Sequence, residues 1–421
     1  MPALLLLWAF AASVRAASPA PLALKDIEGA IWAKNPALQA ARYEADQMKA
    51  MASVEGAWSD PQLSYEWMAL RWPDPVLSDA GRRRLELVQT VPLFGQAWAM
   101  GRTASHAADR AIAQARIEGA SLVYEAKVAF WEAQQANQML KAQAQTQEAL
   151  AAMRKVSAQR GRFGRLDRMG QLMDAMLERE LAGDEAMGLH WQAESRTARY
   201  KLERLMGKDG EATLTAIELV EPDPDALLAP SWSPEEILQK AQHQNPELQE
   251  ALHHVRHADA ALTAARLEWL PMLMVEGGLE EAQGMQEATF KAGINVPWLW
   301  FWKNGGKNAA AKDGLMHARA MAEESRQMLR EQSRMLASEL GLSQAELKLS
   351  VEKILPAAER GLKAAVSGYS SGDLNPRESM DAVMGYFKAQ EDYAHRLWHV
   401  GTTLAAIDRL MAAPPMEMSH E

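Results

Sequence analysis

Cysteine is absent from the 421 residues, which excludes a disulfide framework, a thiolate metal site and a thiol nucleophile. The formal net charge is −10, and an acidic balance argues against nucleic acid as the main partner. We find no phosphate-binding loop, no zinc motif of the H-E-x-x-H type and no dinucleotide fingerprint. The segment Gly368–Gly372 fits G-x-S-x-G, but a helical pattern precedes it where that catalytic turn requires a strand. We therefore expect no enzyme and no cofactor.

Long hydrophobic runs are also missing, so the sequence predicts no transmembrane helix. The short apolar run Leu4–Ala12, followed by small residues at Val14-Arg15-Ala16, predicts a secretory signal over residues 1–16. The basic segment that usually precedes such a run is missing, which favours a start further upstream. The alternative is a short N-terminal anchor, for which the run is too short. Without a cysteine after the cleavage position, we expect no lipid at the mature N-terminus.

Proline is absent from Leu93 to Glu221, and such a stretch permits very long helices because proline breaks a helix interior. Gln96 to Arg160 is rich in good helix formers and would extend roughly 100 Å as one helix. A glycine-flanked turn at 161–167 follows, and helical sequence resumes from Arg168 to Met206. The pattern predicts a long helical hairpin. Its small apolar residues follow the 3-4 rhythm of a coiled-coil seam: Leu122, Ala126, Ala129, Ala133, Ala136 and Leu140.

The second half of the chain repeats the first. Four pairs of segments recur in the same order: 34–39 with 244–249, 61–63 with 271–273, 91–92 with 296–297, and 205–207 with 410–412. We predict a first repeat over 17–220, a proline-rich linker at 221–234, a second repeat over 235–412 and a tail at 413–421. Each repeat holds two strands, at about 62–70 and 83–91, then 272–280 and 288–296. The tips lie at about 161–167 and 368–375.

Strands of about nine residues suit a tilted membrane-spanning strand, and four of them cannot close a barrel without further copies of the chain. Tryptophan gathers beside these strands, as expected of a girdle at the membrane interface. The alternative is ordinary core packing. The girdle candidates are Trp67, Trp72, Trp98, Trp298, Trp300 and Trp302.

The duplicated Asn-Pro-x-Leu motif, the segment Val91–Gly95 and the tip sequence Tyr369–Gly372 resemble the TolC-type outer-membrane efflux family. The resemblance implies a mostly α fold with short β segments, in which duplicated helical hairpins form a periplasmic α-barrel. It implies a homotrimer whose strands pool into a 12-stranded outer-membrane β-barrel. It also implies that the protein acts as the exit duct of a tripartite pump. The implied partners are a periplasmic adaptor, an inner-membrane transporter of the RND type and outer-membrane lipid.

Gln89–Gly95 and the chain length are most similar to the heavy-metal branch of that family, the CzcC-like and CusC-like proteins. Export of heavy-metal cations is then the expected function. Drug efflux and type I secretion use the same scaffold and stay open as alternatives. A soluble periplasmic coiled-coil scaffold is the alternative of another class, although it has no use for a tryptophan girdle.

The resemblance also implies sites. Glu378 and Asp381 match the acidic constriction at the periplasmic end, with Asp174 as the equivalent acid of the first repeat; the alternative is a solvated helix face. The two tips are the expected docking points for the adaptor, although turn chemistry alone explains their glycines. The tip candidates are Arg162, Gly164, Arg165, Leu166, Tyr369, Ser371, Gly372, Asp373 and Leu374.

Metal ligands are the weakest candidates. His253 and His257 have the i, i+4 spacing of a ligand pair, but a solvated helix face explains them as well. The tail offers Met416, Met418 and His420 as soft ligands, although methionines more often serve packing.

Overall fold

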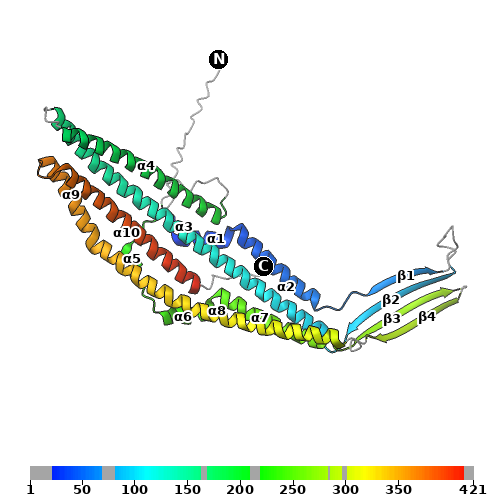
Figure 1. Cartoon of the computed structure of the whole chain (residues 1–421). Helices are drawn as coiled ribbons and strands as arrows, with labels where there is room; N and C mark the ends of the chain where they lie inside the picture. The colour runs from blue at the N-terminus through cyan, green and yellow to red at the C-terminus, as the bar shows by residue number, and fades with distance from the viewer. Residues whose placement is uncertain are drawn as a thin grey trace, which may run out of the picture.

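The computed structural model describes residues 21–68, 81–162, 168–208, 219–282, 285–295 and 301–411, with the side chains of 160–162, 168–173 and 376 left aside. Long helices lie side by side, with a four-stranded sheet at one end and two helical tips at the other (Figure 1). The first repeat consists of α1 (Leu24–Lys34), α2 (Pro36–Glu55), β1 (Gln62–Met68), β2 (Arg82–Pro92), α3 (Gln96–Arg162) and α4 (Arg168–Leu205).

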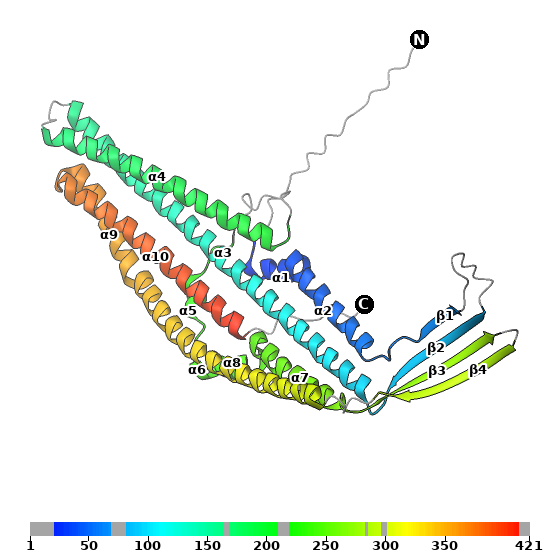
Figure 2. The same ribbon diagram turned by 45° about the vertical axis from the view of Figure 1, so that its right-hand side comes forward.

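The second repeat follows a short helix, α5 (Pro224–Leu228), and has the same order of elements. It consists of α6 (Pro234–Gln244), α7 (Pro246–Leu267), β3 (Met272–Ala282), β4 (Met285–Ile294), α8 (Phe301–Leu349), α9 (Leu355–Ser371) and α10 (Pro376–Met411). A π-helical turn, Ser350–Ile354, joins α8 to α9 just before Pro356. Pro356 lacks an N–H and its ring crowds the preceding turn. It therefore accounts for both the π-helical turn and the bend between α8 and α9 that is seen in Figure 2.

The duplicated Asn-Pro motif has the same structural task in both repeats. Asn35 caps α2 by accepting the backbone N–H of Leu38 at 3.1 Å, and Asn245 caps α7 by accepting that of Leu248 at 2.9 Å. Each amide also donates to a carbonyl in the last turn of a return helix, that of Leu205 for Asn35 at 2.7 Å and that of Leu410 for Asn245 at 3.1 Å. The motif therefore joins α2 to the end of α4 and α7 to the end of α10.

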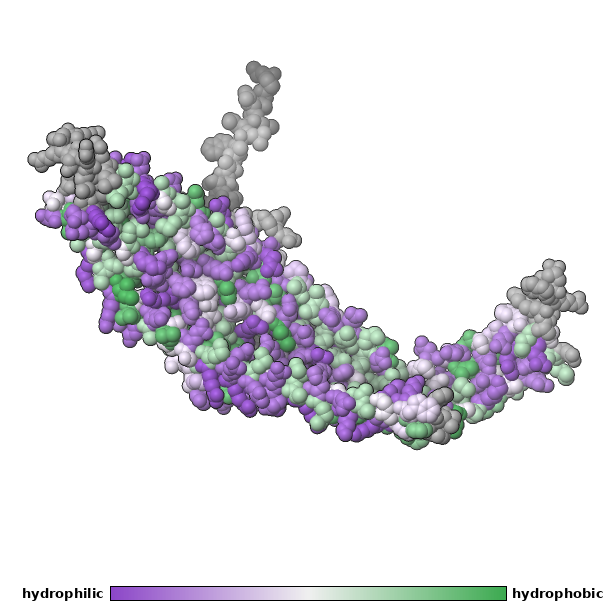
Figure 3. Space-filling model, viewed as in Figure 1, coloured by the Kyte–Doolittle hydropathy of each residue, from purple (hydrophilic) through white to green (hydrophobic). Residues whose placement is uncertain are grey.

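The core is a set of seams along α3 rather than a globular interior, and on the face shown in Figure 3 hydrophilic residues cover much of the helical body. Of the expected seam residues, those from Leu122 to Ala136 are buried, but Leu140 is half-buried and Met139 is buried in its place. A helix with 3.6 residues per turn drifts from a strict 3-4 repeat, so the buried stripe moves by one position. Small residues at these positions let neighbouring helices approach closely.

The helices form one curved layer with two free edges. Near the sheet, α3 packs on α2 and α7, and α7 packs on α8; near the tips, α3 packs on α4 and α10, and α10 packs on α8 and α9 (Figures 1 and 2). The first repeat therefore contributes one edge, made of α2 and α4. The second repeat contributes the other, made of α8 and α9.

None of the helices in the described ranges is both long and apolar enough to cross a membrane.

The strands form an antiparallel sheet in the order β1-β2-β3-β4, and the β2–β3 pairing joins the two repeats. β4 begins three residues earlier than the expected span, at Met285, and the last two positions expected of β1 lie outside the described residues. β1 and β4 are the open edges of the sheet. They continue the same two edges as the helices, since β1 follows α2 and β4 precedes α8.

Candidate functional site

One face of the sheet is apolar and uncovered. The register brings Leu63, Leu87 and Phe290 into one row across the strands, and Leu63 and Phe290 are 70% and 75% exposed. No described element packs over these residues, although burying such side chains normally stabilises a fold. The members of this apolar face include Leu63, Tyr65, Trp67, Leu85, Leu87, Val91, Leu273, Val275, Leu279, Ala288, Phe290, Ala292 and Ile294.

The opposite face, here called the polar face, carries charge. Arg82 and Arg84 reach Glu280 at 2.8 and 3.4 Å. Lys291 contacts both Glu276 and Glu86, the latter at 3.8 Å. Glu66 and Glu287 complete the charged set, and both are exposed. A sheet with an apolar face and a charged face separates lipid from water when its free edges are paired.

Aromatic side chains stand at both ends of the strands. Trp67 lies near the far end of β1, and Trp98 lies in the first turn of α3, where it is 60% exposed with the Arg102 guanidinium 5.3 Å from its ring. Trp302, at the start of α8, is exposed beside Phe301. Trp72, Trp298 and Trp300 lie outside the described residues. The described tryptophans therefore lie at both ends of the strands and are exposed, and the interfacial girdle stays a prediction.

The second tip is built by backbone geometry. Gly372 ends α9 with a φ of 92°, and the N–H groups of Gly372, Asp373 and Leu374 all donate to the carbonyl of Gly368. The Ser371 hydroxyl donates to the carboxylate of Asp373 at 2.7 Å. These residues leave a compact exposed turn. In the first tip, Gly164, Arg165 and Leu166 lie outside the described residues, and the side chain of Arg162 is not described.

Tyr369 corrects one expectation. We expected it among the exposed docking residues, but its ring is only 2% exposed. It packs with Leu150, Leu177 and Val383 in a cluster, here called the tip cluster, that joins α3, α4, α9 and α10. Tyrosine buries a large apolar ring, so its contribution at this position is to hold the two hairpins together.

The acidic candidates lie beside the tip cluster. Glu378 is in the first turn of α10, where its backbone N–H is capped by Asn375 at 2.9 Å, and its side chain is exposed. Asp381 is exposed one turn further along, while Ser379 and Val383 face the core. Asp174 is half-buried near the start of α4, on the other side of α3. The carboxylates of α10 thus face away from their own protomer's packing.

The histidine pair does not gain further ligands. Burial is the main cause that lowers the pKa values of both His253 and His257, although Asp109 partly offsets it at His253. No group of three or more metal-binding side chains comes together in the ranges that the structure describes. Met416, Met418 and His420 lie outside those ranges.

Two buried polar sites were not anticipated. Lys127, on α3, makes ion pairs with Glu28 at 2.7 Å and Asp408 at 2.8 Å, which join α1 and α10. Asp184 occupies a core position of the α3–α4 seam at 4% exposure, and one of its carboxylate oxygens has no hydrogen-bond partner. Only the heptad position of Asp184, seven residues after Leu177, could have indicated its burial.

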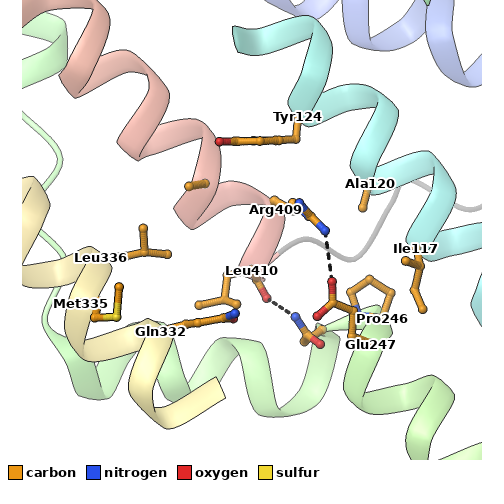
Figure 4. A pocket seen from close by; sticks show the side chains of 12 residues that line it. Ile117, Ala120, Tyr124, Pro246, Glu247, Gln332, Met335, Leu336, Arg409 and Leu410 are labelled. Atoms are coloured by element: carbon orange, nitrogen blue, oxygen red, sulfur yellow. Dashed lines mark hydrogen bonds and ion pairs between the residues drawn. The ribbon is translucent and has the colours of Figure 1, made fainter. Parts of the chain in front are cut away.

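A small pocket opens where α10 ends and α7 begins (Figure 4). Its volume is about 250 Å³, and Arg409 crosses it to reach Glu247 at 3.2 Å, beside the contact between Asn245 and Leu410. These contacts hold the two helix ends together across the gap. We assign the pocket this joining role.

Comparison with known proteins agrees with this geometry. Residues 237–413 match a family model described as outer membrane efflux protein. Curated proteins gave no match. The solved outer-membrane channel OprN is 17% identical, over 93% of this chain and 90% of its own, with a TM-score of 0.77. A membrane protein from Pseudomonas aeruginosa is 18% identical over 92% of each chain, with a TM-score of 0.78. CusC, whose structures concern transmembrane channel formation, is 16% identical over 92% of each chain, with a TM-score of 0.73. The chain has the fold of these channels, which confirms the expected fold class.

Proposed function

We propose that this protein is the outer-membrane duct of a tripartite efflux system, and that it exports heavy-metal cations. The observation that carries the proposal is the sheet: one uncovered apolar face, one charged face and two open edges, at the end of a long helical body. An exposed apolar face of this kind is stable when it contacts lipid, and a charged face is stable when it is hydrated. The helical body supplies a conduit of roughly 100 Å, the length of a helix such as α3.

Three copies are the smallest number that forms an open duct. Four strands per chain give eight in a dimer, and the interior of an eight-stranded barrel is filled by side chains. Twelve strands in a trimer leave a lumen. Open strand edges are not tolerated in lipid, so β1 of one copy pairs with β4 of the next.

The helical edges carry complementary apolar stripes for the same closure. On α8, an exposed apolar side chain recurs every seven residues, at Met321, Met328, Met335, Leu342 and Leu349, with exposures of 42% to 64%. On α4, small and apolar residues stay exposed, among them Ala182, Ala186, Leu189 and Ala193. Pairing one edge with the other in every copy generates a closed ring.

The duct is passive, and an inner-membrane transporter supplies the energy through an adaptor that meets the exposed tips. Glu378 and Asp381 contribute six carboxylates around the axis of a trimer, which attracts cations. The resemblance of Gln89–Gly95 to the heavy-metal branch is what supports metal as the cargo. Opening separates the hairpins at the tip cluster.

Two measurements test assembly. The protein should fractionate with the outer membrane, and in detergent its mass should be that of three chains without the predicted signal segment 1–16, somewhat less than three full chains of 46.5 kDa. Met328→Glu/Met335→Glu should abolish the trimer, because it places charge in the apolar stripe of α8. Arg334→Glu, on an exposed position of the same helix, is the matched control. Recovery of the wild-type chain as a soluble periplasmic protein would favour a coiled-coil scaffold and refute the duct.

Cargo is tested by the susceptibility of a deletion strain, complemented with wild type or with Glu378→Ala/Asp381→Ala. Selective sensitivity to zinc, cobalt, cadmium, copper or silver supports metal export. Sensitivity to dyes, detergents or antibiotics instead identifies a drug-efflux duct. Full protection against metals by the double variant would show that the carboxylates are not required.

A further inference from the structure

The polar face of the sheet holds more negative than positive charge. It carries five carboxylates and three cationic groups within the described strands: Glu66, Glu86, Glu276, Glu280 and Glu287 against Arg82, Arg84 and Lys291. The only charged residues on the apolar face within the described strands are Arg83 and Glu281, which lie opposite each other at the far end of the strands. The excess of two negative charges per chain therefore belongs to one face.

The ion pairs show where that excess lies. Glu280 makes two ion pairs, one with Arg82 at 2.8 Å and one with Arg84 at 3.4 Å. Lys291 is a single cation shared between Glu86 and Glu276. Neither exposed carboxylate at the two outer strands, Glu66 on β1 and Glu287 on β4, makes an ion pair with any described residue.

We infer that this face is a charge filter, set in the strand region of the duct and distinct from the tip, that favours cations over anions. The inference rests on the proposed function, because that function places the polar face around a water-filled lumen. Three copies then contribute six excess negative charges to one short section of the duct. Charge of one sign inside a low-dielectric wall raises the local concentration of the opposite ions, as rings of carboxylates do in cation channels.

Glu66 and Glu287 are the determining residues of this filter. They lie in the same cross-strand row as Arg84 and Glu280, at opposite edges of the sheet. When β1 and β4 of neighbouring copies pair, these two edges meet. Their carboxylates then border the same junction from two chains, and each of the three junctions gains both. Glu378 and Asp381 lie roughly 100 Å away by the length of α3, so the two sets can be varied independently.

The test is the ratio of cation to anion permeability, from the reversal potential of the purified trimer in planar bilayers under a potassium chloride gradient. Glu66→Gln/Glu287→Gln should lower this ratio at least about twofold, because a nearby unit charge interacts with an ion on the scale of RT even in water. Lys291→Gln should raise the ratio. Both effects should disappear near 1 M salt, where the screening length falls to about 3 Å.

Glu281→Gln is the matched control, since it removes the same charge from the next residue of β3 but on the apolar face. It should leave the ratio unchanged. An unchanged cation-to-anion permeability ratio in Glu66→Gln/Glu287→Gln would overturn the inference, and so would an equal fall of that ratio in Glu281→Gln. Neither result would contradict the proposed function as a duct. Absence of any conductance from the wild-type trimer would instead overturn the proposed function. If the double variant fails to form trimers, Lys291→Gln decides the question, and an unchanged or lower ratio refutes the filter.

Discussion

The joint between α7 and α10 gives the most direct prediction of stability. Asn245 is 4% exposed and makes two bonds, one from Leu248 N–H to its carbonyl oxygen and one from its amide to the carbonyl of Leu410. Loss of a helix cap costs about 1 kcal/mol, and leaving a buried carbonyl without a donor costs about 1–3 kcal/mol. Asn245→Ala should therefore lower the local opening free energy of this joint by roughly 2–4 kcal/mol.

A second substitution separates the two contributions. Asn245→Ser keeps an oxygen that caps α7 but has no amide to reach Leu410, so we expect it to lose only the second contribution, about 1–3 kcal/mol. Amide hydrogen exchange of the trimer in detergent measures both ends of the joint. Protection should fall at the first turn of α7 only in the alanine variant, and at the last turn of α10 in both variants.

Asn35→Ala provides the comparison from the first repeat. Asn35 makes the equivalent bonds to Leu38 and Leu205, so it should loosen α2 and α4 and leave α7 and α10 protected. Wild-type exchange at the end of α10 in Asn245→Ala would refute the joining role of the motif.

Three further perturbations test other parts of the structure. Leu177→Ala removes a fully buried member of the tip cluster and should destabilise the packing of the two hairpins by about 2–5 kcal/mol. The loosened tips should let a large antibiotic, normally excluded by the outer membrane, enter through the duct. Exclusion as strong as that of wild type would contradict the role of the cluster. Burial raises the pKa of Asp184 above its ordinary value of 3.8. The contribution of the protonated side chain to hairpin stability is therefore fully present below pH 3.8 and is lost as the pH rises through the raised pKa. Asp184→Asn should therefore slow amide exchange of α4 at pH 7 and match wild type at acid pH, and faster exchange at pH 7 would refute this sign. Gly207→Ala should lower the thermal midpoint, because φ is 65° and a Cβ would lie 2.5 Å from the carbonyl oxygen of Lys34. Gly183→Ala, where a Cβ meets nothing within 4 Å, is the control and should not destabilise.

The sequence by itself determined the long helices, the strands and the internal repeat. These depend on local and periodic properties: absence of proline, a 3-4 spacing of small residues, and recurrence of Asn-Pro at the same offset. Such properties act through the backbone and through helix faces, so they can be detected without knowing the neighbours. The outer-membrane channel fold implied by the family resemblance is confirmed by the solved channels.

Only the tertiary structure decided which side chains meet. Tyr369 is in a turn sequence that suggests exposure, but the convergence of four helices at the tips buries its ring. Asp184 reads as a surface acid, and its place in the α3–α4 seam makes it a core residue. The separation of the sheet into an apolar and a charged face depends on the register between β2 and β3, strands almost 200 residues apart in sequence. Strand register and the burial of these polar and tip side chains arise from contacts between distant segments, so the local sequence around each residue does not specify them.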